Sequence, residues 1–106
     1  MIVNVMDERA DNIVRIKLDE ILDISGAADL KASLLSALEG ATDPTDFILE
    51  ADAVQRVDTA ALQVLSAFVQ DVRAREQNVQ WVQPSTALSG SAKLIGLSGL
   101  MALNDA

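Results

Sequence analysis

The sequence contains no cysteine, no histidine and no tyrosine. The absence of cysteine excludes a disulfide framework, a thiolate nucleophile and any metal site built on cysteine. The absence of histidine removes the commonest general base and the commonest metal ligand. Most enzyme chemistry is thereby left without its usual side chains, so we expect a non-enzymatic protein with no metal and no cofactor.

Long apolar segments and clusters of basic residues are also missing. No apolar run approaches the roughly 20 residues of a membrane span, and Met1–Glu8 lacks the basic start and long apolar segment of a signal peptide. The 16 acidic residues outnumber the 8 basic ones, which are scattered singly, and the net charge is −8. Such a surface repels phosphate backbones and anionic headgroups. We therefore expect a cytoplasmic protein with no nucleic-acid binding and no membrane insertion, and a basic protein partner stays possible.

The residues that are present are sufficient for one folded domain. The chain has 106 residues, of which 50% are hydrophobic and 23% charged. It is therefore long enough for a single core and too short for two. We expect one domain over residues 1–106, as a monomer or a weak dimer.

The first part of the chain predicts a β-hairpin. Ile2–Met6 is a short β-like run, and Ile13–Leu18 alternates apolar and charged residues as a strand with one wet face does. The polar segment Asp7–Asn12 between them predicts a turn and hence antiparallel pairing. A brief apolar segment, Ile21–Ile24, follows the hairpin.

Helical spacing of apolar residues marks three later segments. Ala27–Leu38 is the first, with Ser25 as its predicted N-cap and Gly40 as its stop. The second helix runs from about Thr59 to Arg75, and Pro84 with Ser85 opens the third. The inner face of the third helix is predicted to carry three apolar residues: Leu88, Ala92 and Ile95.

Two further strands, Phe47–Ala51 and Val79–Val82, alternate with these helices. Trp81 lies within the second of them and is expected in the core. Long helices between strands imply right-handed crossovers and parallel pairing. The sequence therefore predicts an α/β fold, in which a small mixed sheet begins with an antiparallel hairpin, continues with parallel strands and is covered by about three to four helices.

A polar pair, Asp58-Thr59, stands where the buried strand Phe47–Ala51 gives way to the second helix. In an open α/β sheet, ligands and partners usually meet the protein at the carboxyl ends of the strands. The loop that holds Ser25 is expected at the same edge. This junction is the first candidate for a functional site.

Four motifs, in order, resemble the STAS domain family, which includes anti-sigma-factor antagonists and the cytoplasmic tails of sulfate transporters. The opening half of that family is similar to Val14–Lys17, Ile21–Asp23 and the helix start at Ser25–Leu30. Its signature, a strand followed by Asp-Ser/Thr-x-Gly-Leu at the start of a helix, resembles Phe47–Ala51 and Val57–Leu62. The closing motifs of the family resemble two further stretches: Val79–Val82 with Pro84, and Leu97–Leu100.

The resemblance implies a regulatory protein-interaction domain, anti-sigma-factor antagonist-like, whose partner is a switch kinase or anti-sigma factor. The position that corresponds to the family's phosphoacceptor is Thr59. Added phosphate charge is favoured there by the unpaired N–H groups and the dipole of a helix start. The implied partner-binding residues lie in two loops and the helix start: Asp23, Ile24, Ser25, Val57, Asp58, Thr59, Ala60, Ala61 and Leu62.

The sequence departs from the family pattern at two positions. Ala61 replaces the usual glycine and is expected to crowd a close partner backbone, and Thr59 replaces the more common serine. Relatives with threonine include the cytoplasmic STAS subunit of bacterial lipid-transport ABC systems, whose partner is an ATPase. The alternative is therefore a constitutive subunit of such a complex or of a chemotaxis assembly, without phosphorylation. On the plainest interpretation, Thr59 or Asp58 only caps the helix.

Overall fold

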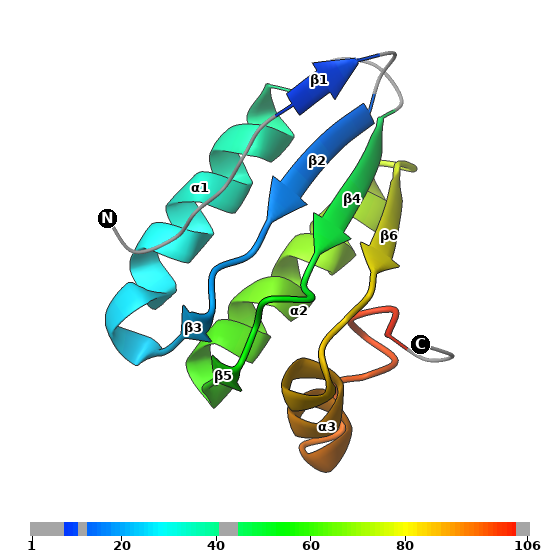
Figure 1. The fold of residues 1–106 in the computed structure, drawn as a ribbon. Helices are drawn as coiled ribbons and strands as arrows, with labels where there is room; N and C mark the ends of the chain where they lie inside the picture. The colour runs from blue at the N-terminus through cyan, green and yellow to red at the C-terminus, as the bar shows by residue number, and fades with distance from the viewer. Residues whose placement is uncertain (1–7, 11–12, 41–44, 104–106) are drawn as a thin grey trace.

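A four-stranded sheet forms the centre of the computed structural model (Figure 1). The structure describes residues 8–10, 13–40 and 45–103. Along the sheet the strands are β1 (Glu8–Ala10), β2 (Ile13–Lys17), β4 (Asp46–Glu50) and β6 (Asn78–Val82). β1 is antiparallel to β2, and the other neighbours are parallel. The predicted α/β class with a mixed sheet is confirmed.

The hairpin does not lie where the sequence predicted it. Its first strand, Ile2–Met6, lies outside the described residues, and β1 occupies part of the segment predicted as a turn. β1 is an edge strand in which Glu8 stands opposite Arg15. An edge strand commonly contains charged residues. The polar composition of this segment therefore did not preclude a strand.

Two long helices cover one face of the sheet: α1 (Ala27–Glu39) and α2 (Thr59–Ala74). Each connects one parallel strand to the next, and successive crossovers in the same direction place both helices on the same side. Figure 1 shows them side by side behind the strands. Both begin at the edge where β2 and β4 end. The predicted bounds of both helices are correct to within one residue.

A second, two-stranded sheet lies beyond the carboxyl ends of the main strands. β3 (Ile21–Leu22) pairs in parallel with β5 (Arg56–Val57). The sequence predicted an apolar segment at the first but not a strand at the second. This pairing fixes the loop that follows β2 beside the loop that follows β4, so it brings the two parts of the candidate site together.

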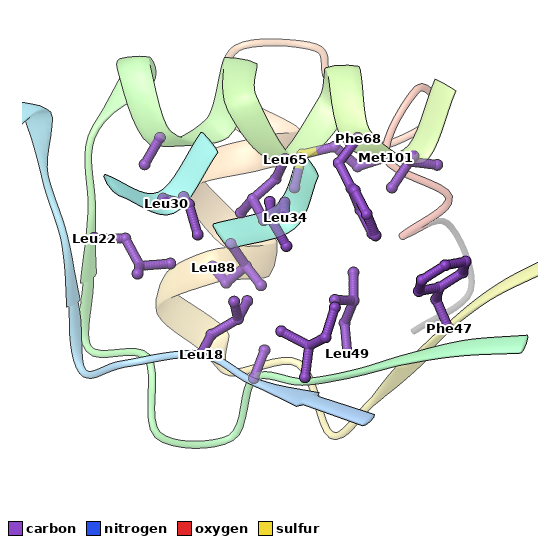
Figure 2. Packing of buried hydrophobic residues seen from close by; sticks show 14 of the residues in the cluster. Leu18, Leu22, Leu30, Leu34, Phe47, Leu49, Leu65, Phe68, Leu88 and Met101 are labelled. Atoms are coloured by element: carbon purple, nitrogen blue, oxygen red, sulfur yellow. The ribbon is translucent and has the colours of Figure 1, made fainter. Parts of the chain in front are cut away.

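The core lies between the main sheet and the helices (Figure 2). Alternate residues of β4, Phe47 and Leu49, are fully buried and face Leu65 and Phe68 of α2. The rings of Phe47 and Phe68 meet edge to face, with centroids 5.5 Å apart. On the opposite face of the sheet, an exposed Arg15 forms an ion pair with Glu50 at 3.1 Å. The period-two alternation of the strands is thus explained by one buried and one wet face.

The third helix, α3 (Thr86–Leu94), ends one residue before Ile95, the last residue of its predicted inner face. Leu88 and Ala92 are buried as predicted, but Ile95 is 42% exposed, so its predicted inward position is wrong. The cause is the helix end at Gly96, whose φ is +79°, a conformation that favours glycine. Leu97 N–H donates to the carbonyl of Ala92 at 2.8 Å, which closes a Schellman-type cap.

The chain after α3 folds back against β6. The half-buried Trp81 donates its indole N–H to the carbonyl of Met101 at 2.7 Å, and the side chain of Met101 is fully buried. This bond gives the polar atom of a partly buried aromatic side chain its partner. The predicted core position of Trp81 is therefore confirmed in part, because the ring packs against the core without being enclosed by it.

Candidate partner-binding site

Asp58 joins the two loops of the candidate site. It occupies the N-cap position of α2 with extended backbone, yet its side chain makes no capping hydrogen bond to the helix. Instead, the backbone N–H of Ile24 donates to Asp58 Oδ2 at 3.2 Å, and Asp58 N–H donates to the carbonyl of Leu22 at 2.8 Å. The carboxylate therefore ties the loop after β3 to the start of α2.

Asp23 organises the first loop in a similar way. It caps the short 3₁₀ helix η1 (Ile24–Gly26) by accepting from the N–H of Gly26 at 3.3 Å. The hydroxyl of Ser25 donates to the same oxygen at 2.6 Å. This hydroxyl bond is the main cause that holds the pKa of Asp23 below its ordinary value; desolvation opposes it, and backbone N–H groups and the charge of Arg56 support it.

The predicted role of Ser25 as the N-cap of α1 is wrong. Gly26 occupies that position, and no side chain caps the helix there. The reason is that η1 inserts a turn before α1, so the hydroxyl of Ser25 lies within reach of Asp23 and not of the first amides of α1. The loop itself lies beside Asp58, as the sequence predicted.

The exposed surface of the site combines a hydroxyl group with apolar side chains. Thr59 is the first residue of α2 and is exposed. Ile24 is 74% exposed on the neighbouring loop, and Ile21 on β3 is 47% exposed. An apolar side chain as large and as exposed as Ile24, beside a polar helix start, is the kind of anchor that a partner pocket can enclose. Ile21 could not be identified from the sequence, because β3 has only two residues and shows no alternation.

The remaining predicted site residues lie at different depths. Ala60 and Val57 are partly exposed, whereas Ala61 and Leu62 are only 0% and 2% exposed. The buried pair supports the surface from beneath. The methyl group of Ala61, which replaces the family's usual glycine, lies in the core.

The charges of the site are mainly negative. Asp23 and Asp58 carry the carboxylates that organise the two loops, and Arg56 is the cation that acts on Asp23. In the part of the chain that the structure describes, no three acidic residues come together in a way that could hold a metal ion.

The fold and this helix start define a small α/β domain of the STAS type. The family model described as Mlab, STAS domain, matches residues 5–103, so the chain belongs to the STAS domain family. No curated protein is similar enough to count as a match. Within the described residues, no helix is both long enough and apolar enough to cross a membrane.

Solved structures share the fold at low sequence identity. A putative anti-sigma factor antagonist from Thermotoga maritima is 16% identical, with a TM-score of 0.75 over 90% of this chain and 80% of the other. The Bacillus cell fate determinant SpoIIAA in its phosphorylated form is 18% identical, with a TM-score of 0.69 over 91% and 86%. A structure titled Mglu is 21% identical, with a TM-score of 0.66 over 80% of this chain. The chain covers only 21% of the length of that protein.

Proposed function

We propose that this protein is a non-enzymatic regulatory interaction domain, similar to anti-sigma-factor antagonists, that binds a switch kinase or anti-sigma factor. Its docking surface is the start of α2 together with the loop from Asp23 to Ala27. The observation that carries the proposal is the bond between Ile24 N–H and Asp58, which holds both segments on one surface beside the exposed Thr59. Membership of the STAS family supports it, as does the likeness to a putative anti-sigma factor antagonist and to a cell fate determinant in its phosphorylated form.

Phosphorylation of Thr59 is the proposed control. The side chain is exposed and therefore open to a kinase, and it lies at the positive end of a 16-residue helix whose N-cap side chain bonds elsewhere. A phosphate adds about two negative charges at neutral pH. It would stand beside Asp58 and close to the apolar Ile24 surface. A partner that covers this surface without phosphate would meet added bulk and charge, so phosphorylation releases it.

The test is phosphate transfer from a purified switch kinase of the source organism. The protein is incubated with the kinase and Mg-ATP, and the modified residue is identified by mass spectrometry. We expect one added phosphate at Thr59 and none in Thr59→Ala. The matched control is Thr86→Ala, because Thr86 is likewise exposed and is the first residue of α3. Transfer to Thr59→Ala at the wild-type level would exclude Thr59 as the acceptor.

A constitutive accessory subunit of a lipid-transport ABC complex is the second candidate. The observation that favours it is the family description itself, which names Mlab. In that case Thr59 contacts a transporter ATPase and is not modified. A purified ATPase should then bind the unmodified chain, and Thr59→Glu should weaken that binding while Thr86→Glu does not. If Thr59 stays unmodified and the ATPase binds, the accessory-subunit function replaces the phosphorylation-gated one.

A further inference from the structure

An apolar groove of about 430 Å³ runs along the outer side of the helix pair. Two buried side chains, Leu34 of α1 and Phe68 of α2, lie at its base. Small side chains form its walls, among them the exposed Ala28 on α1 and the exposed Ala67 on α2. Alanine at these positions leaves room that a larger side chain would fill, so the groove is a direct consequence of the sequence.

The groove has the length of a short helix. Its lining extends along α1 from Ala27 to Leu35 and along α2 from Ala60 to Asp71. With a rise of 1.5 Å per residue, these intervals span about 12 Å and about 16 Å. A partner helix of about two to three turns covers the same distance. Because α1 and α2 start at the same sheet edge, the two helices run side by side (Figure 1).

The openness of the groove favours a protein segment over a small ligand. Small-molecule sites bury most of the surface of their ligand, whereas Ala28, Leu35 and Ala67 are all exposed here. An amphipathic helix needs only one face covered, and such helices bind grooves through side chains at i, i+3, i+4 and i+7. The geometry therefore points to an apolar helix face as the occupant.

The charges around the groove indicate which charge the partner helix should have beside its apolar face. Asp71 lies at one end, and at the other Asp23 and Asp58 belong to the segments that precede Ala27 and Ala60. Lys31 is the single cation in the lining, and the chain as a whole has a net charge of −8. Basic residues flanking the apolar face of the partner helix would complement this field and speed association.

We propose that this groove receives a two- to three-turn amphipathic helix of the regulatory partner, with an aliphatic face and basic flanks. The proposal rests on the proposed function and extends it, because the groove begins at Ala60, next to Thr59, and at Ala27, next to η1. A phosphate on Thr59 stands at the mouth of the groove, where it blocks entry of the helix.

The test is a titration followed by NMR with the ¹⁵N-labelled protein. The probe is a synthetic peptide with leucine at i, i+3, i+4 and i+7 and lysine at its other positions. We expect saturable shifts confined to the facing sides of α1 and α2. Ala67→Arg fills one wall and should weaken binding by about tenfold or more. The matched control, Ala32→Arg, makes the same charge change at an exposed position of α1 outside the groove, and should change affinity by less than about twofold.

Four results would overturn the proposal. One is equal binding of a control peptide in which serine replaces the leucines, which would show that charge alone attracts the probe. Another is a set of shifts on the open sheet face near Arg15 or on α3. A third is lauric acid producing the groove shifts while the peptide produces none, which would make the groove a small-ligand site. Equal losses in Ala67→Arg and Ala32→Arg would exclude a steric role of the groove.

A second groove variant checks the result with the first, and a second binding partner separates the groove proposal from the proposed function. Ala28→Arg fills the opposite wall from an exposed position and should act as Ala67→Arg does, and circular dichroism verifies that both variants fold. Binding of the purified switch kinase separates the two proposals. If Thr59→Glu prevents that binding and Ala67→Arg does not, the proposed function stands and the groove proposal fails. If peptide binding follows the groove variants but the kinase never binds, the proposed function fails on its own.

Discussion

Removal of the Asp58 carboxylate should loosen the loop that carries Ile24. In Asp58→Ala, the N–H of Ile24 loses the oxygen to which it donates at 3.2 Å. A hydrogen bond to a charged acceptor contributes about 1.5 to 3 kcal/mol, but water can replace an exposed partner, so we expect a loss below this range, about 1 kcal/mol. For a domain of this size, that loss lowers the Tm by about 4 °C. Asp58→Asn keeps a side-chain oxygen and should cost less than half as much.

Two measurements verify this reasoning. Urea unfolding gives the free energy of each variant, and native-state hydrogen exchange reports on the amide of Ile24 alone. The exchange rate of that amide should rise about fivefold in Asp58→Ala, in line with 1 kcal/mol. Asp52→Ala is the control, since it removes an exposed carboxylate from the same connection. An unchanged Ile24 amide, or equal losses in the alanine and asparagine variants, would refute the bridging role of Asp58.

Three further predictions concern the core, one turn and one carboxyl group. Leu65→Ala removes a fully buried side chain and should cost about 3 kcal/mol in urea unfolding, whereas Leu94→Ala, at an 87% exposed position, should cost less than about 0.5 kcal/mol. Gly96→Ala, at φ +79°, should cost about 1 kcal/mol or more in the same assay. Ser25→Ala should raise the pKa of Asp23 towards its ordinary value, which NMR titration can follow. A folded-state pKa that is lowered stabilises the protein above the unfolded-state pKa, and this stability is lost as the pH falls through the folded-state pKa. The variant should therefore lose less stability in acid than the wild type.

The long elements of the fold were predictable, because burial imposes a period on them. In α2, apolar residues at helical spacing fixed both ends to within one residue, and in β4 a dense apolar run fixed a central strand. The short strands were not predictable. β1 consists of Glu8–Ala10, whose charged residues resemble a turn, and β5 consists of two residues that pair only because β3 lies beside them.

The candidate site shows the same division. The sequence indicated Asp58-Thr59 as a helix start and indicated that the Ser25 loop lies nearby, since both follow parallel strands. It could not show that Asp58 bonds to Ile24 N–H instead of capping its own helix, because that choice depends on the η1 turn. Ala61, in contrast, lies at helical spacing from Leu65 and Phe68, and this spacing agrees with its burial in the core.

The groove between α1 and α2 could not be predicted from the sequence either. Its alanines lie more than 30 residues apart along the chain, on two helices whose crossing determines which small side chains meet. Periodicity identifies the buried stripe of each helix but not the gap left beside it. Only the packed pair reveals that Ala28 and Ala67 face a common space.

Partner affinity of the Thr59→Glu variant tests the central claim most directly. The measurement is the Kd for the purified switch kinase by isothermal titration calorimetry, with wild type, Thr59→Glu and Thr86→Glu compared under identical conditions. The matched pair places the same charge at the first residue of two exposed helix starts. A carboxylate at position 59 should weaken binding by about tenfold or more, while the change at position 86 leaves the Kd unaltered. Equal affinity of all three proteins would contradict the claim that the start of α2 is the docking surface.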